Sequence, residues 1–372
     1  MSCSLPQEIL DLIIDHLRDE PDMLKICCVV SKPWVQRTRK YLFFHVKFHP
    51  LGRRVSGWRK TFPDLMNSPA HNTRVLSICH PWVIAGVDVG TLRTFCGVVH
   101  LNVNTDLWSD QAVSLVPFHG FSPVIRSLHL TFTFLRNSKV FDLIYSLPLL
   151  EDLTLVSRAR RRGDEMWNTP STSPRFTGSL ELRLLEGIQS TTDRLLDLPN
   201  GLRFTKITVP WLSEEDVLST IRLISMCSGT LESLDIANYL SDASQGVSLD
   251  LSKATKLQNV VFRSKKGAKI EWITTALHTV ESKNIQQISL ELSNYVFWQT
   301  IRQEWLDLDS LLVQFWTSHS LRPKVMYEST AGGSADQRNV ARLLPELMRR
   351  GIVDLAEYPY VRQDFPSFTT TL

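Results

Sequence analysis

The chain has 372 residues, of which 43% are hydrophobic and 21% are charged, a composition typical of a folded globular protein that excludes global disorder. Lysine and arginine outnumber aspartate and glutamate by 41 to 38, and a net charge of only +3 argues against a general nucleic-acid binder and mildly for a protein partner. This length predicts two or three domains or one long repeat array.

The cysteine and hydropathy patterns indicate the compartment. Six cysteines are scattered without a Cys-x-x-Cys pair, and no Asn-x-Ser/Thr sequon occurs. This usage is typical of a reducing compartment, in which thiols serve as small core side chains. No basic leader precedes an apolar segment, and no apolar run approaches the roughly 20 residues that cross a bilayer. We therefore expect a cytoplasmic or nuclear protein without a membrane attachment.

The first forty residues predict three short helices. After Pro6, Ile9, Ile13 and Leu17 recur at helical spacing, and Pro21 interrupts the chain before two further helices. About forty residues is near the lower limit for an independent core, so these helices cannot bury all their apolar side chains among themselves. The remaining apolar surface predicts either a partner that accepts a helix in a groove or a helical cap on the array that follows.

The same segment contains a pattern of mainly apolar and small residues: Leu5-Pro6, Glu8-Ile9, Ile13, Leu17, Leu24, Cys27, Val29-Val30-Ser31 and Trp34. Through these residues the segment 1–44 resembles an F-box, and the trailing Leu-Phe-Phe-His-Val is similar to the large fungal F-box families. It implies docking onto the Skp-type adaptor of a cullin–RING ubiquitin ligase. The sequence does not separate residues that face the adaptor from residues that face the helices' own core. The motif match places the following residues in the adaptor contact: Leu5, Pro6, Ile9, Ile13, Leu24, Val30 and Trp34.

Short strand-like segments recur through residues 45–372. One apolar position in each marks the repeat: Leu76, Leu101, Leu128, Leu153, Leu182, Ile207, Leu234, Val260, Ile288, Val325 and Val353. The intervals run from 25 to 29 residues with one exception of 37, and Val46 lies 30 residues before Leu76 and indicates one more strand. A period in the twenties with an L-x-x-L-x-L-like core is the leucine-rich-repeat signature.

Helical patterns lie between the strands, at residues 138–146, 213–224, 271–282 and 335–350, with two helices expected in 296–319. The predicted fold is α/β: a three-helix F-box, then an irregular right-handed α/β solenoid with a parallel sheet, a leucine-rich-repeat-like horseshoe. We expect irregularity because the asparagine that closes the turn in typical leucine-rich repeats is mostly absent. A doubly wound α/β domain is the alternative, but it hardly needs eleven or twelve strands at such even spacing.

The alternation of side chains along the strands nominates a target-binding face. If Leu128 and Leu130 point into the solenoid, their neighbours face the open concave side. This rule nominates Asn102, Asn104, His129, Thr131, Thr154, Arg183, Thr208, Asp235 and Arg263, together with Ser289 and Glu291. The alternative for any one of them is an ordinary solvated sheet face.

The sequence offers no motif for catalysis, a cofactor or a metal. His45 and His49 lie four apart on a predicted strand, so roughly 13 Å separates them, too far to share one ion. The segment 242–246 has aspartate where a nucleophile elbow needs its first glycine. A basic loop, 158–162, admits an acidic-target clamp, phosphate recognition, nuclear import or nucleic-acid contact, besides a plain solvated loop.

We therefore expect a non-enzymatic adaptor without cofactors. The F-box would dock a Skp-type adaptor and cullin scaffold, the solenoid would bind a protein target that the sequence does not name, and other subunits would transfer ubiquitin. The main alternative is a leucine-rich interaction module whose N-terminal helices only cap the array. An enzyme hidden in an unusual α/β fold is a further alternative, which would need a buried polar pocket at the strand ends.

Overall fold

The structure, a computed structural model, divides into two compact units, Met1–Phe176 and Thr177–Leu372, which are taken one at a time. Within the part of the chain that is described, no helix is both long and apolar enough to cross a bilayer. The described residues are 6–48, 55–64, 67–79, 89–104, 118, 121, 123–132, 137–157, 174–184, 188–198, 201–210, 212, 216–238, 248–264, 270–292, 302–329 and 340–359.

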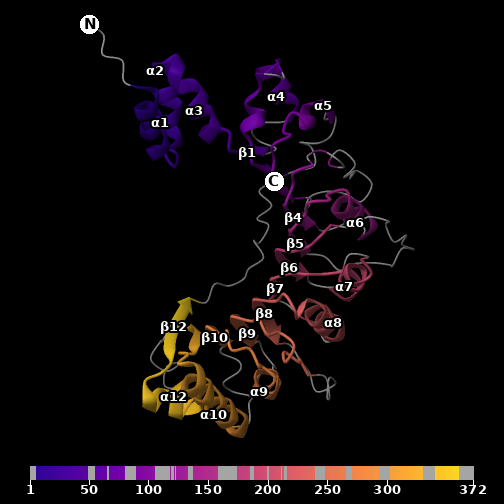
Figure 1. The fold of residues 1–372 in the computed structure, drawn as a ribbon, viewed down its shortest axis with the longest axis vertical. Helices are drawn as coiled ribbons and strands as arrows, with labels where there is room; N and C mark the ends of the chain where they lie inside the picture. The colour runs from indigo at the N-terminus through magenta and orange to yellow at the C-terminus, as the bar shows by residue number, and fades with distance from the viewer. Residues whose placement is uncertain are drawn as a thin grey trace, which may run out of the picture. The chain divides into compact units, whose positions relative to one another are not determined.

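The first unit starts with three helices and continues with strands separated by short helices (Figure 1). Its elements are α1 (Gln7–His16), α2 (Pro21–Val30), α3 (Lys32–Leu42), β1 (His45–Phe48), α4 (Val55–Thr61), η1 (Pro69–Asn72), β2 (Val75–Ile78), α5 (Val89–Arg93), β3 (His100–Asn104), β4 (Ser127–Phe132), α6 (Asn137–Tyr145) and β5 (Asp152–Ser157). Strands β1 to β5 pair in sequence order, and each pair is parallel. The pairing aligns Val46, Leu76, Leu101, Leu128 and Leu153 in one row, as their spacing predicts.

The second unit repeats the alternation of strand and helix. Its elements are β6 (Ser179–Leu184), α7 (Ile188–Leu196), β7 (Lys206–Val209), α8 (Val217–Cys227), β8 (Ser233–Asn238), β9 (Asn259–Ser264), α9 (Ile270–His278), β10 (Gln287–Leu292), α10 (Arg302–His319), β11 (Lys324–Ser329), α12 (Pro345–Arg350) and β12 (Asp354–Pro359). Strands β6 to β12 are again parallel and paired in sequence order. Both units therefore have the α/β, solenoid-like architecture that the repeat period predicts.

Strand register differs from the prediction by two residues at three places in the second unit. Apolar side chains alternate along these strands, so a shift of two residues keeps the same face buried. Hydropathy alone therefore does not distinguish the two registers, and the backbone hydrogen bonds between the strands determine which one forms. The observed pairs are Leu180 with Ile207, Leu290 with Val325 and Val325 with Leu355, where Leu182, Ile288 and Val353 were predicted.

A backbone carbonyl before the strands ties successive repeats together. The carbonyl of Phe44 accepts the N–H groups of Arg74 at 2.9 Å and Val75 at 3.0 Å, and the Arg74 carbonyl accepts those of Val99 and His100. The same arrangement recurs at Val99, Arg126, Gly178, Thr205, Glu232 and Gln258. These bonds satisfy the amides at the strand starts without any side chain, so no residue type in the sequence marks them.

The core lies between the strands and the helices that follow them. Leu101, Leu128 and Leu130 are at most 1% exposed, which confirms the predicted inward alternation. On the second unit, Phe262 of β9 is fully buried and meets Trp272 of α9 edge to face, with ring centroids 5.7 Å apart. Such contacts attach each helix to its own strand and make the helices and strands of a repeat one packing unit.

The segments predicted as helices are largely helical where they are described. The described part of 296–319 holds one helix, α10, rather than two, and in the segment 335–350 α12 begins at Pro345. Gly351 ends α12 with φ +62°, a left-handed conformation that glycine adopts without strain.

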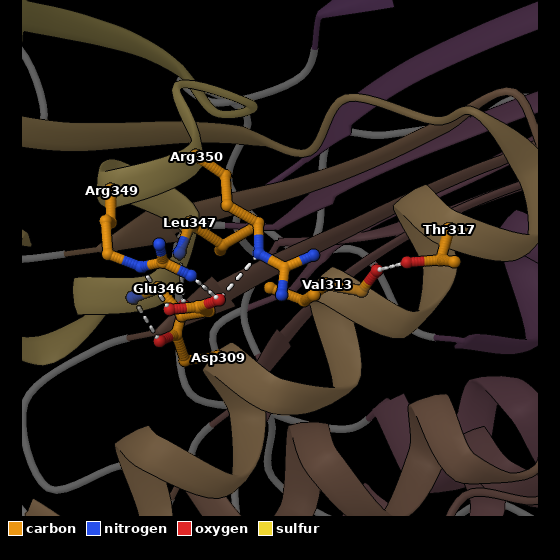
Figure 2. A network of polar contacts seen from close by, with 7 residues as sticks. All are labelled: Asp309, Val313, Thr317, Glu346, Leu347, Arg349 and Arg350. Carbon is orange, nitrogen blue, oxygen red and sulfur yellow. Dashed lines mark hydrogen bonds and ion pairs between the residues drawn. The ribbon is translucent and has the colours of Figure 1, made fainter.

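A buried carboxylate of α10 caps α12 (Figure 2). Asp309 is 2% exposed and accepts the backbone N–H groups of Glu346 at 2.7 Å and Leu347 at 3.0 Å. Glu346 in turn forms ion pairs with Arg349 and Arg350, both with nitrogen–oxygen distances of 2.6 Å. The short helix lacks a capping acceptor in its own sequence. Asp309 supplies it, although it lies 37 residues before Glu346 and 38 before Leu347.

Candidate functional site

The N-terminal helices are held together by a clamp on Asp15. Arg37 donates to both of its carboxylate oxygens, from Nε at 2.7 Å and from Nη2 at 2.5 Å, and the Tyr41 hydroxyl donates at 2.7 Å. The bonds from Arg37 and Tyr41 lower the pKa of Asp15 to about 2, although burial opposes this. Because Asp15 lies on α1 and both donors lie on α3, the clamp fixes the angle between these helices.

The clamp predicts an acid-dependent stability difference between the wild type and Asp15→Asn. A carboxyl whose folded pKa is depressed stabilises the fold above its unfolded pKa of about 3.8 and loses that contribution as the pH falls toward about 2. We expect the wild type to be more stable than the variant at pH 6 and the difference to shrink between pH 4 and pH 2. Urea titrations of both proteins across this range measure it, and a pH-independent difference would contradict the assignment.

The outer faces of α1 and α2 are apolar. Of the twelve large apolar side chains that are exposed among the described residues, eight lie between Ile9 and Phe44. On α1, Ile9, Leu12 and Ile13 form a stripe at helical spacing, and Leu12 is 56% exposed. The stripe on α2 comprises Met23, Ile26, Val29 and Val30. We call these seven side chains the apolar stripes.

The structure separates the predicted adaptor contacts into exposed and buried residues. Pro6, Ile9, Ile13 and Val30 are exposed, and Trp34 is half-buried. Leu24 is only 1% exposed and is buried, as Cys27 and Ile14 are, so the prediction that it contacts the adaptor is corrected. Leu5 lies outside the described residues. Leu12, Met23, Ile26 and Val29 are also exposed but were not among the predicted contacts, although their spacing of three and four residues indicates an apolar face.

The open face is the sheet face that carries the outward residues of the strand alternation. In the first unit it is a row of mostly uncharged polar groups: the Ser77 hydroxyl lies 2.9 Å from Nε2 of His45 and accepts Nδ2 of Asn102 at 3.1 Å. Burial lowers the pKa of His45, with a smaller contribution from Lys47. His129 is exposed, with Nε2 3.2 Å from the Thr131 hydroxyl. Asn104 and Thr154 are half-buried on the same face.

In the second unit the open face carries an ion-pair network. Arg263 on β9 donates from Nε and Nη2 to the two carboxylate oxygens of Asp235 on β8, at 2.6 Å and 2.8 Å. Its Nη1 also donates to Glu291 on β10. Burial raises the pKa of Glu291, and Arg263 opposes the shift. Arg183, which is exposed, pairs with Glu181 two residues earlier. The face therefore presents fixed charges of both signs, which suits a polar protein surface better than a polyanion.

Three short side chains predicted on the open face are largely covered. Thr131, Thr208 and Ser289 are 7%, 9% and 1% exposed, so the prediction that they are open to a target is corrected. All three lie on the correct face. Thr208 and Ser289 lie between longer neighbours in register, Thr208 between Glu181 and Asp235 and Ser289 between Val261 and Lys324. In a parallel sheet the neighbouring strands are about 4.8 Å apart, so longer side chains on both sides shield a short one.

Other features weighed in the sequence have no described counterpart. The basic loop 158–162, the segment 242–246 and His49 lie outside the described residues. Within the described part of the chain, no group of three or more His, Cys, Asp or Glu side chains could hold a metal ion.

Comparisons with known proteins give little direct guidance. No protein-family model and no curated protein matches the chain. Among solved structures, the chain is similar to one in the crystal structure of the Rad7 and Elc1 complex in yeast, with 12% sequence identity and a TM-score of 0.39. That alignment covers 89% of this chain and 94% of the other.

Proposed function

We propose that this protein is the substrate-recognition adaptor of a Skp–cullin–F-box ubiquitin ligase. In this proposal α1–α3 are an F-box that docks a Skp-type adaptor through the apolar stripes, and the open face of the solenoid binds a protein target. Ubiquitin is transferred by other subunits, so the chain itself acts as a scaffold and needs no nucleophile, metal or cofactor.

The observation that carries the proposal is the exposure of the apolar stripes. Val29, Val30 and Ile26 are 87%, 63% and 56% exposed, while Ile14 and Leu24 on the same helices are buried. The helices thus have a core of their own and a second apolar surface that they leave uncovered. Helices that present apolar residues at this spacing typically bind in a partner's groove. The F-box resemblance of the same segment names the partner class.

The alternative is that α1–α3 only cap the array. The packing of α3 against η1 favours it, because this joins the helices to the first repeats. However, a cap keeps a repeat protein in solution by presenting a polar outer face. The apolar stripes are the opposite of what a cap requires, and for this reason we prefer the docking function.

Co-purification of the full chain with a Skp-type adaptor and a cullin tests the proposal. We expect the wild type to capture both and Ile13→Asp or Val30→Asp each to weaken adaptor binding by about 2 kcal/mol, roughly 30-fold. Leu218→Asp on α8 is the matched control, since Leu218 is 62% exposed and lies outside α1–α3. Circular dichroism checks that all three variants fold.

Trp34 is left unchanged in these variants because it is half-buried, and its loss would confound binding with folding. Failure of the wild type to capture the adaptor would leave the capping role as the better account. Equal weakening by Leu218→Asp would show that the stripes are not the contact.

A further inference from the structure

A second property of the N-terminal region is the separation of its charges. Residues 32–63 contain nine lysines and arginines and no aspartate or glutamate, whereas the remaining 340 residues carry a net charge of −6. Residues 6–30 contain six carboxylates and two basic side chains, Arg18 and Lys25. The sign of the charge therefore reverses at Ser31, between α2 and α3.

Helix α3 presents part of this positive charge on one face. Lys32, Arg39 and Lys40 are exposed, and with the exposed Gln36 they recur at intervals of three and four residues, which places them along one side of the helix. The fourth cation of α3, Arg37, is on another side and is occupied by Asp15. We call Lys32, Arg39 and Lys40 the basic face of α3.

The basic face is not neutralised within the described part of the chain. Neither Lys32 nor Arg39 forms an ion pair with a described carboxylate, and Lys40 lies 5.9 Å from the centroid of the Tyr41 ring. Of the carboxylates of α1 and α2, Asp15 is paired with Arg37 and has only a minor electrostatic interaction with Lys40, and Asp22 is paired with Lys25. Arg39 and Lys40 are neighbours in the chain, and Lys32 lies about two helical turns before them on the same side. An external anionic surface is the favourable partner for these like charges.

We infer that the basic face of α3 is the charged rim of the docking surface, and that it steers an acidic patch of the adaptor protein onto the apolar stripes. The inference rests on the proposed docking function and adds the chemistry of the partner: carboxylates opposite α3, beside a groove that accepts α1 and α2. Lys32 follows Val30 by two residues, so the basic face begins in the sequence where the apolar stripes end. A charged rim around an apolar centre is the usual anatomy of a protein interface, and its main effect is on the association rate.

A nucleic acid is the other polyanion that could meet this face. The stripes argue against it, because a phosphate backbone gives seven exposed apolar side chains no contact to make. The aromatic residues of α3, Trp34 and Tyr41, are half-buried, and Tyr41 is bonded to Asp15, so neither is presented for base stacking. An acidic protein surface uses both features at once.

The association kinetics of the full chain with a purified Skp-type adaptor test this inference. The test variant is Lys32→Glu/Arg39→Glu/Lys40→Glu, and the control is Lys253→Glu/Lys256→Glu/Lys283→Glu, which changes the net charge equally at exposed lysines of the second unit. At low ionic strength we expect the test variant to associate at least 10-fold more slowly, with a dissociation rate within about threefold of the wild type. The wild type should lose its advantage at high salt. A Lys32→Gln/Arg39→Gln/Lys40→Gln variant should have an association rate between those of the wild type and the test variant.

Three other results would contradict the steering inference, and they can be told apart. Equal association rates for the test and control variants would overturn the steering inference and leave the docking proposal standing. A wild type that does not bind the adaptor at any salt concentration would remove both. An unchanged adaptor rate together with loss of binding to a random-sequence DNA duplex would assign the basic face to nucleic acid instead.

Discussion

Replacing Phe262 by alanine is expected to lower the free energy of unfolding of the second unit by about 3–5 kcal/mol, the usual cost of truncating a fully buried aromatic ring. The ring is 0% exposed and joins β9 to α9 through its edge-to-face contact with Trp272. Its loss leaves a cavity between strand and helix. In a repeat array each repeat contacts only its neighbours, so the destabilisation should be greatest around β8–β10. Urea unfolding gives the total, and amide hydrogen exchange shows where it acts.

Val261→Ala is the matched control for this prediction. Val261 precedes Phe262 on β9 but points to the open face, where it is half-buried, so its truncation should cost about 1 kcal/mol or less. If both variants lost the same stability, the assignment of the two faces of β9 would be wrong.

Replacing Asp309 by alanine has the next largest expected effect, about 2–4 kcal/mol. The change leaves two backbone N–H groups at the start of α12 without acceptors, and each unsatisfied buried donor costs about 1–3 kcal/mol. The removed contacts are those to Glu346 and Leu347 (Figure 2). We expect α12 and the adjoining β12 to exchange their amide protons faster than the rest of the unit, because α12 has lost the acceptors at its N-terminus.

Asp309→Asn separates the role of the acceptor from that of the charge. Asparagine keeps one acceptor oxygen, so it should retain one of the two bonds and lose less stability than alanine. Burial raises the pKa of Asp309, which means that its ionised form already carries a desolvation cost that asparagine avoids. An asparagine variant as unstable as the alanine variant would indicate that packing, and not the cap, is the role of this residue.

Both proposed binding surfaces are held in a fixed geometry before a partner binds. The Asp15 clamp and the buried Leu24 fix α1–α3 so that the apolar stripes are presented without rearrangement. On the open face, the network around Arg263 holds three long side chains of β8, β9 and β10 in place. Groups already held in their bound geometry lose less entropy on association.

Much of the fold could be predicted from the sequence. The repeat period predicted the strands, and the alternation of Leu128 and Leu130 with polar residues predicted their faces, because both signals are local and depend on backbone geometry. Pro21 predicted the break after the first helix, and in the structure it begins α2, since its fixed φ suits the first turn of a helix. The charge separation at Ser31 is also a property of the sequence alone.

What only the tertiary structure decided depends on residues distant in the chain. Leu182 and Leu180 are equivalent to a pattern of period two, and only strand pairing chose between them. Thr208 is on the predicted face but is shielded by neighbours 27 residues away on either side. The same holds for function: Leu24 and Val30 both fit the F-box pattern, and only the packing of α2 buries one and exposes the other. Burial and hydrogen bonding depend on which groups meet in space, and a one-dimensional pattern does not contain that information.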